Sequence, residues 1–175
     1  STDYVFDGKK KGFYKETDQV NPINIYGRSK WFGEEAVRNN SNKYIIIRTS
    51  NVFGQYGHNF VKTMLKIGRK KTISMVNDLS SCPTEASAIA DAVFDIINVF
   101  SRKKELEWGT YHYCGKENST FYDFAKIIFQ TANKIMDYPI PDIIPITSRE
   151  SPSQSNRPKN TALCCSKIEN VFNVI

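Results

Sequence analysis

The sequence predicts an α/β fold, in which helices cover a parallel sheet and a smaller lobe follows in the C-terminal half. Segments with strand and helix patterns alternate along the chain, which is typical of parallel sheets because each crossover places a helix on a face of the sheet. Residues 44–50 (YIIIRTS) form a near-continuous aliphatic run, as expected for a strand covered on both faces. Residues 139–160 are rich in Pro and Ser, so we expect them to wind irregularly over the surface.

In the first half of the chain, residues 3–6 (DYVF) have the pattern of a strand that is ending. A helix is predicted from about Tyr26 to Asn39. Its apolar positions are Trp31, Phe32, Ala36 and Val37. Residues 51–57 (NVFGQYG) form a glycine-bearing loop, and residues 59–68 form a helix that Gly68 closes.

In the second half, residues 72–76 (TISMV) predict a short strand and residues 83–100 a strongly periodic helix with a cap region at Thr84. The apolar side of that helix contains Ile89, Val93, Ile96, Ile97 and Phe100. Residues 109–115 (GTYHYCG) predict a strand between glycines. A second periodic helix follows over residues 119–132, capped by Ser or Thr, and a short terminal helix begins at about Ser166.

Length and composition are those of a globular protein. The chain has 175 residues, of which 40% are hydrophobic, enough for a substantial core. Its net charge of +6 comes from scattered lysines, with dense clusters only at residues 9–11, 68–71 and 102–104. These clusters fall in expected turns or helix ends, where basic residues are favourable, so we do not expect a nucleic-acid partner.

The four cysteines, at positions 82, 114, 164 and 165, show no metal-binding spacing, and His58 and His112 are isolated in the sequence. We therefore expect no metal site and reduced thiols, as in a cytoplasmic protein. No apolar run approaches the roughly 20 residues needed to span a bilayer, so we expect no membrane partner.

Tyr26 and Lys30 are the first candidates for chemistry. Residues four apart lie on the same face of a helix, so the phenol and the ammonium would face one space. Ligands of parallel sheets bind outside the carboxyl ends of the strands. Residues 1–3 (STD) and 48–54 (RTSNVFG) would open onto that crevice, as would the start of the Tyr26 helix.

Several segments together resemble a known family. In order along the chain they read STDYVFDG, NPINIYGRSKWFGE, RTSNVFG, NFVKTML, NDLSSCPT, GTYHYCG and RPKN. A Tyr-x-x-x-Lys pair alone is weak evidence, but this ordered set is similar to the dTDP-4-dehydrorhamnose reductases, which are extended short-chain dehydrogenase/reductases. The resemblance covers their C-terminal part only. It implies a partial Rossmann-like sheet with the catalytic Tyr–Lys helix in residues 1–80, and a substrate-binding lobe mainly in residues 81–175, the two being interleaved.

The resemblance also implies an enzyme that reduces the 4-keto group of dTDP-4-dehydro-L-rhamnose with NADPH or NADH, in the synthesis of cell-surface polysaccharides. The catalytic residues would be Thr2, Asp3, Tyr26 and Lys30. A free tyrosine has a pKa of about 10, so a tyrosine proton donor needs a nearby cation, which Lys30 would supply. Thr2 would hold the carbonyl oxygen, whereas Asp3 could equally well cap a turn.

Further site residues follow from the same resemblance. Tyr26 and Lys30 would contact the cofactor together with Arg48, Thr49 and Ser50. The substrate would contact Thr2, Asn51, Phe53, Thr84 and Arg157, the last because a guanidinium suits a diphosphate. Asn51 stands where the family leads us to expect Trp, and Leu79 where it leads us to expect Gln. Both departures concern the sugar substrate more than the type of reaction.

The nine glycines never fall as Gly-x-Gly, so the turn that holds a dinucleotide pyrophosphate is absent from this chain. We expect a missing N-terminal half, or a homodimer partner, to complete the protein. Two alternatives stay open: a non-catalytic binding protein similar to the regulatory subunit of methionine adenosyltransferase, and another nucleotide-sugar epimerase or dehydratase. An intact Thr2, Tyr26 and Lys30 favour the reductase.

Overall fold

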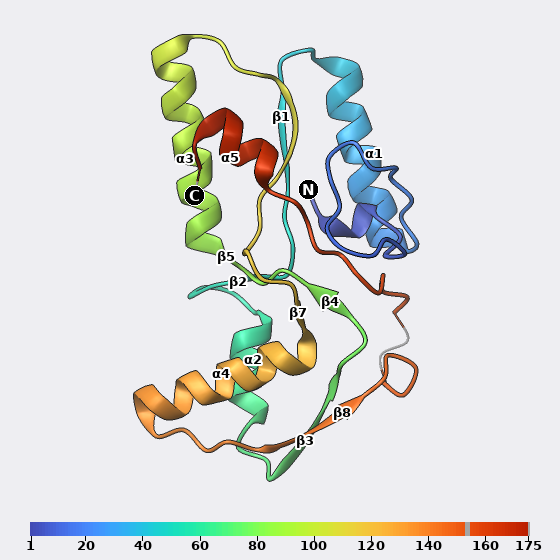
Figure 1. Ribbon diagram of the computed structural model, residues 1–175, viewed down its shortest axis with the longest axis vertical. Coiled ribbons are helices and arrows are strands. Elements are labelled where there is room, and N and C mark those ends of the chain that lie inside the picture. The colour runs from blue at the N-terminus through green and yellow to red at the C-terminus, as the bar shows by residue number, and fades with distance from the viewer. Residues whose placement is uncertain (153–154, 175) are drawn as a thin grey trace.

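The computed structural model describes residues 1–152 and 155–174. It has two parts joined by short strands (Figure 1). The helices are α1 (Ile25–Asn40), α2 (Phe60–Ile67), α3 (Ala86–Lys103), α4 (Phe121–Met136) and α5 (Ser166–Phe172), with a 3-10 helix η1 (Asp3–Val5). The strands are β1 (Ile45–Arg48), β2 (Val52–Phe53), β3 (Thr72–Val76), β4 (Ser80–Ser81), β5 (Thr84–Glu85), β6 (Gly109–His112), β7 (Ser119–Thr120) and β8 (Asp142–Ile146).

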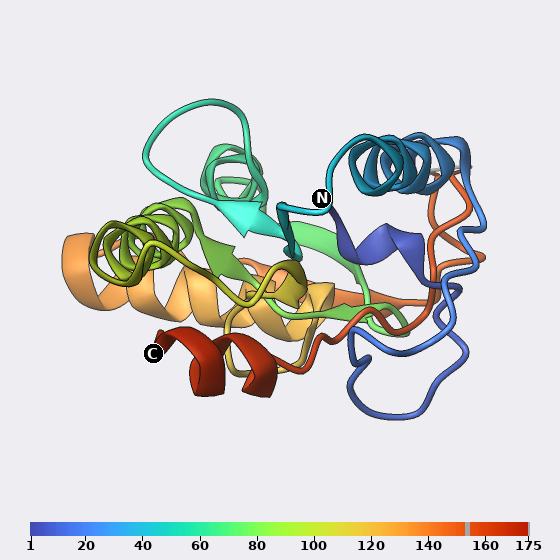
Figure 2. The same ribbon diagram turned by 90° about the horizontal axis from the view of Figure 1, so that it is seen from above.

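The strands pair two by two, and three of the four pairs are parallel. β1 runs parallel to β6, with Ile45 opposite Gly109 and Arg48 opposite His112. β2 pairs with β5 and β3 with β8 in the same sense, whereas β4 and β7 are antiparallel. Helices α1 and α5 lie on opposite sides of the strands (Figure 2). The predicted α/β class with parallel pairing is therefore confirmed.

Each part has its own apolar core. In the part built from α2, α4, β3 and β8, one face of α4 is buried. Its buried residues are Phe124, Ala125, Ile128, Phe129 and Ala132, the spacing of a single helix face. The Thr120 hydroxyl caps this helix by accepting a hydrogen bond from the backbone N–H of Asp123 at 3.0 Å. The other part contains two smaller clusters, one around Phe6 and one around Tyr111.

Five predicted helices and the strands near residues 45, 72 and 109 are confirmed, but four details are wrong. Residues 3–5 form a 3-10 helix instead of a strand end, because the Thr2 side chain accepts from the Tyr4 N–H and tightens the turn. Residues 142–146 form strand β8 inside the expected surface segment. Pro145 is tolerated there because β8 pairs only with β3 among the described strands.

The third correction concerns the start of α3, whereas the predicted end of α2 is confirmed. Thr84 does not cap α3: its hydroxyl donates to the Ser50 carbonyl at 2.6 Å, and Glu85 occupies the cap position without a side-chain bond. Gly68 closes α2, as predicted, with an ordinary right-handed φ of −68°. A glycine is needed there for space, because a Cβ would lie 2.1 Å from the Phe129 ring.

The fourth correction concerns α1, whose apolar residues do not form a buried face. Phe32 is 68% exposed and Val37 43%, whereas the buried positions are Gly27 and Glu34. The Glu34 carboxylate accepts from Arg48 Nε at 2.9 Å and from Arg48 Nη2 at 2.7 Å, and also from Arg38 at 2.7 Å. A buried ion pair, not hydrophobic contact alone, thus fastens α1 to β1. No helix among the described residues is long and apolar enough to cross a membrane.

Candidate active site

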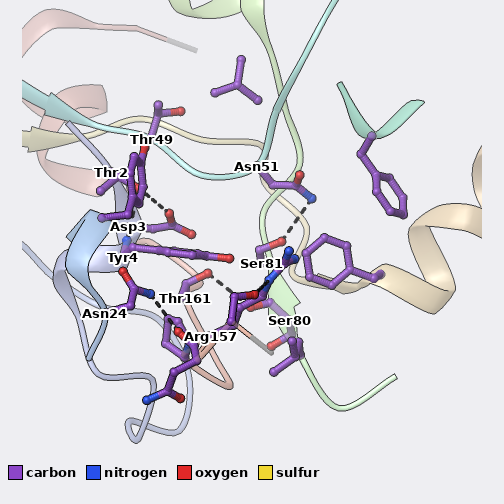
Figure 3. A pocket seen from close by; sticks show the side chains of 18 of the residues that line it. Thr2, Asp3, Tyr4, Asn24, Thr49, Asn51, Ser80, Ser81, Arg157 and Thr161 are labelled. Atoms are coloured by element: carbon purple, nitrogen blue, oxygen red, sulfur yellow. Dashed lines mark hydrogen bonds between the residues drawn. The ribbon is translucent and has the colours of Figure 1, made fainter. Parts of the chain in front are cut away.

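A cavity of about 900 Å³ lies beyond the carboxyl end of β1, where the N-terminal turn, the start of α1 and the segments around β4 and Arg157 meet. In Figure 3, Thr2, Asp3, Tyr4 and Thr49 lie on one side of the cavity, with Asn51 and Ser81 opposite them. Its lining includes Thr2, Asp3, Tyr4, Asn24, Tyr26, Thr49, Asn51, Phe60, Leu79, Ser80, Ser81, Phe121, Asn156, Arg157 and Thr161. These residues are distant in the sequence, so tertiary structure alone assembles the site.

Backbone contacts fix the position of Thr2. Thr2 forms a parallel bridge with Thr49, and the Asp3 N–H donates to the Thr49 carbonyl at 3.0 Å. Thr2 is buried, and its hydroxyl donates to Asp3 Oδ1 at 3.0 Å. The hydroxyl is thus held at the end of β1, on the wall of the cavity.

The start of α1 brings Tyr26 to the same cavity. Asn24 caps the helix by accepting from the Gly27 N–H at 2.8 Å. Gly27 packs so closely on η1 that an added Cβ would lie 2.1 Å from the Tyr4 carbonyl oxygen. This approach sets the Tyr4 and Tyr26 rings edge to face, 5.9 Å apart. Lys30 Nζ lies 5.7 Å from the Tyr26 ring centroid, so the predicted pairing along the helix is confirmed.

Asp3 is almost completely buried beside Thr2 and accepts from the Ser50 hydroxyl at 2.7 Å. Burial raises the pKa of this carboxyl, while hydrogen bonds from Thr161, Ser50 and Thr2 oppose the rise. Burial, then the charge of Asp3, also raises the pKa of Tyr4, and Arg157 acts against it. The inner wall therefore combines a shielded acid with hydroxyl groups.

Thr49 Oγ1 is the buried side-chain oxygen for which the described residues provide no hydrogen-bond partner. Thr49 lines the cavity. An unpaired buried hydroxyl is costly, by about 1–3 kcal/mol, unless a ligand or water completes it. Thr49 is therefore available to a bound molecule.

The predicted residues separate into two groups. Thr2, Asp3, Tyr26, Thr49, Asn51 and Arg157 line the cavity, and Lys30 stands behind Tyr26. Arg48, Ser50, Phe53 and Thr84 are outside its lining. Arg48 pairs with Glu34, and the Phe53 ring packs 5.5 Å from that of Phe124. The expected ligand contacts of these four side chains stay predictions.

The two departures from the family pattern both face the cavity. Asn51 has a φ of 43°, in the left-handed region that Asn tolerates better than most side chains do. Its amide donates to the Ser81 hydroxyl at 3.3 Å. Leu79 is buried and lines the same cavity, so an apolar surface replaces the amide expected there.

Sequence reasoning missed Tyr4, Asn24, Ser80, Ser81 and Thr161 as lining residues. Tyr4 lies in the 3-10 helix η1, so the two-residue spacing of a strand gives no signal for its place beside Thr2. The serines and Thr161 carry no local signal. Among residues 1–152 and 155–174, no group of three or more His, Cys, Asp or Glu side chains is arranged to hold a metal ion.

Comparison with known proteins agrees with this geometry. Residues 1–175 match the family model described as the RmlD substrate binding domain. The dTDP-4-dehydrorhamnose reductase of Aggregatibacter actinomycetemcomitans is 40% identical over 177 residues, covering 99% of this chain and 60% of that protein. That of Salmonella typhimurium is 35% identical, covering 100% of this chain and 59% of that protein. The chain thus spans about 60% of the length of these curated relatives.

Solved structures show the same relationship. A dTDP-4-dehydrorhamnose reductase from Bacillus anthracis, in complex with NADP, superposes with a TM-score of 0.85 at 36% identity, over 97% of this chain and 57% of that one. The Clostridium acetobutylicum protein gives 0.86 at 34% identity, over 99% and 57%. A dTDP-glucose 4,6-dehydratase at 20% identity, with a TM-score of 0.72, shares the fold.

Proposed function

Since the chain belongs to the family of the RmlD substrate binding domain, we propose that it carries the sugar site and proton-transfer residues of an NAD(P)H-dependent reductase. The substrate would be dTDP-4-dehydro-L-rhamnose and the product dTDP-L-rhamnose. One observation carries the proposal: Tyr26 stands half exposed in the cavity wall, with Lys30 beside its ring and Thr2 in the same cavity.

Reduction of a 4-keto sugar needs a hydride at the carbonyl carbon and a proton at its oxygen. A nicotinamide supplies the hydride when it is bound. Tyr26 would donate its phenolic proton to the oxygen, and Lys30 would stabilise the phenolate that remains. The Thr2 hydroxyl now donates to Asp3, so it must rotate to donate to the substrate oxygen. The Tyr4 N–H, 3.3 Å from Thr2 Oγ1, keeps that oxygen in place during the rotation.

The residues fit one end of a dinucleotide. Tyr26 and Lys30 are exposed beside the cavity, and Thr49 Oγ1 has no partner among the described residues, so these groups would hold the nicotinamide side. No Gly-x-Gly turn is present to receive a pyrophosphate. We therefore propose that a further dinucleotide-binding part supplies the rest of that site.

The free edge of β1 would receive this part. Among the described residues, β1 pairs with β6 on one side, and on the other only Ser1 to Asp3 bond to the end of the strand, at Ile47 and Thr49. An apolar groove of about 350 Å³ runs between β1 and α3. Its lining includes Ile45, Ile47, Val93, Ile97, Phe100 and Trp108. An exposed apolar surface of this kind favours burial under a further layer of the fold. The relatives are longer than this chain, which is consistent with such a layer.

The substrate would extend from the Thr2 end of the cavity toward Arg157. The Arg157 guanidinium lies 5.7 Å from the Phe121 ring centroid, and its Nε donates to the Ser155 hydroxyl at 3.1 Å. It is exposed, so it would be accessible to a diphosphate. A second cavity of about 670 Å³ adjoins it and shares Phe60, Leu79 and Arg157. We assign the nucleoside to that second cavity.

The test is oxidation of NADPH by dTDP-4-dehydro-L-rhamnose, followed at 340 nm, with the protein expressed together with its dinucleotide-binding part. Replacing Tyr26→Phe removes the proton donor and should lower kcat by a factor of about 10² to 10⁴. Tyr56→Phe is the matched control, because Tyr56 is 84% exposed and outside the cavity lining. Equal activity of both variants would refute the assignment. No turnover by the parent protein would favour a non-catalytic binding protein.

The 175-residue chain alone should bind dTDP but not NADPH at micromolar concentration, as measured by calorimetry. Micromolar NADPH binding would refute the need for a further part.

A further inference from the structure

Three of the four cysteines meet in the folded chain, although the sequence spaces them far apart. Cys82 and Cys114 are buried, and Cys165 is partly buried beside them. The Sγ atoms of Cys114 and Cys165 are 3.6 Å apart, which is van der Waals contact, and all four cysteines are free. Cys114 follows β6 and Cys165 precedes α5, so the two thiols face each other across a packing boundary.

The two thiols are not equivalent. The Cys114 N–H donates to Cys165 Sγ at 3.3 Å, and the Cys114 thiol can also donate to the Leu163 carbonyl at 3.5 Å. A hydrogen bond from the Cys114 thiol, which burial opposes, lowers the pKa of Cys165. The same bond, with burial, raises the pKa of Cys114. Cys165 is therefore the member that ionises first, and a thiolate is the reactive form of cysteine.

A small reagent can reach this pair. A cavity of about 350 Å³ adjoins it, separate from the candidate active site. Cys114, Cys164 and Cys165 line this cavity together with Phe13, Lys116 and Leu163. Cys164 turns away from the pair, with its Sγ 3.3 Å from the Ser166 hydroxyl. Exposure alone therefore does not distinguish Cys164 from Cys165, whereas the contact with Cys114 does.

We propose that Cys165 and Cys114 form an oxidant-sensitive pair, which hydrogen peroxide converts into a disulfide bond between the end of β6 and the start of α5. The Cys165 thiolate attacks one peroxide oxygen, the O–O bond breaks, and the released hydroxide takes up a proton to give water and a sulfenic acid. The Cys114 sulfur then attacks the Cys165 sulfur, and the S–O bond breaks. The departing hydroxide takes the Cys114 proton as a second water. The two thiols lose two electrons, which reduce one peroxide.

The folded chain favours this pairing over others. The sulfur atoms need to approach by only about 1.5 Å to reach bonding distance, which a rotation of the Cys165 side chain and a small shift of the first turn of α5 can provide. Cys164 and Cys165 are adjacent, and a bond between neighbours is strained. Cys82 also touches Cys114, so it is the competing partner that the experiment must distinguish.

The experiment treats the reduced 175-residue protein with hydrogen peroxide, removes the excess with catalase, and alkylates the remaining thiols with N-ethylmaleimide under denaturing conditions. Intact mass should show the loss of two of the four alkylatable thiols. Peptide mapping should find one linked pair containing Cys114 and Cys165. Cys164→Ser is the matched control and should form the same bond at the same rate, whereas Cys165→Ser should not form it.

Cys114→Ser should leave a sulfenic acid on Cys165 that reacts with dimedone. A bond between Cys82 and Cys114, a bond involving Cys164, a link between two chains, or oxidation of all four thiols at one rate would each overturn the proposal. Circular dichroism checks that the serine variants are folded. If one of them is not, peptide mapping of the parent protein still decides between the pairings.

Discussion

Gly27, in the YGRSK segment at the start of α1, has no room for a larger side chain, so its replacement should destabilise the protein. Replacing it with Ala would place a Cβ 2.1 Å from the Tyr4 carbonyl oxygen and 3.0 Å from Pro22 Cβ. The nearest atom belongs to the backbone of η1, so no side chain can rotate away. Either α1 or the turn must move by about 1 Å, and a forced shift of this kind costs about 1–3 kcal/mol.

Gly33 provides the matched control on the same helix. It is exposed, and a Cβ there would meet no atom within 4 Å. Gly33→Ala should stabilise the protein by about 0.5–1 kcal/mol, because alanine is the better helix former. Gly27 lies in the first turn, where this gain is smaller. The two variants should therefore differ by at least about 1–3 kcal/mol, which corresponds to several degrees in Tm for a domain of this size.

Urea unfolding followed by circular dichroism measures the difference, as a shift in midpoint at constant slope. In the protein expressed with the proposed dinucleotide-binding part, Gly27→Ala should also lower kcat, since the same contact sets Tyr26 against Tyr4. If Gly27→Ala is as stable as Gly33→Ala, then the close approach of α1 to η1 does not exist and the derived site geometry fails with it.

Three further predictions concern the ion pairs of α1, the buried His112 and the end of α3. Glu34→Gln should lower the free energy of unfolding in urea by about 3–5 kcal/mol, because the buried Arg48 loses its carboxylate partner. Glu35→Gln, at a half-exposed ion pair, should lower it by less than about 1 kcal/mol. Similar losses in the two variants would argue against the buried pair. Burial, and then the charge of Arg48, lower the pKa of His112 to about 3. Below pH 6.5, His112 therefore binds a proton in the unfolded chain but not in the folded chain. The free energy of unfolding should fall by several kcal/mol as the pH falls from about 6.5 to about 3. His112→Asn should make the stability less dependent on pH over that range. Lys104→Gly should stabilise by about 0.5–1 kcal/mol, because Lys104 is exposed with a φ of 58°, and a lower Tm would contradict this account.

Local sequence patterns predicted the elements that bury the face on which their apolar residues lie. Helix α4 was predictable, since a hydroxyl cap precedes apolar residues at helical spacing and that face is the one buried. The apolar residues of α1 misled for a physical reason. Its contact with β1 is the ion pair between Glu34 and Arg48, which joins residues 14 apart in the sequence and has no periodic signature. Strand β8 was missed because its Pro145 argues against a strand. Proline is excluded only from strands that are paired on both sides, and β8 pairs with β3 alone among the described strands.

The sequence predicted site residues that lie at a fixed spacing along one helix. It did not predict contacts between residues that only the tertiary fold brings together. Tyr26 and Lys30 are one helical turn apart, so their pairing follows from the sequence. Arg48 was expected to contact the cofactor because the family resemblance places its loop beside the nicotinamide. The structure shows its side chain turned instead to Glu34, a partner that only the packing of α1 reveals. Thr161 reaches the cavity from 159 positions beyond Thr2, and no local rule indicates that.

Two segments that are synthesised far apart in time, residues 12–14 and 160–163, contact each other in the folded chain. Asn160 donates to the Gly12 carbonyl, 148 residues away, at 2.6 Å, and Tyr14 pairs with Leu163. Closing a loop of that length costs roughly 4 kcal/mol of chain entropy, and contacts of such separation form slowly. A ribosome must therefore release almost all of residues 1–163 before Thr2 and Arg157 can share a cavity. Until then the N-terminal turn, with Thr2 and Tyr4, remains without its wall, and a nascent chain stopped before residue 157 has no site to offer a ligand.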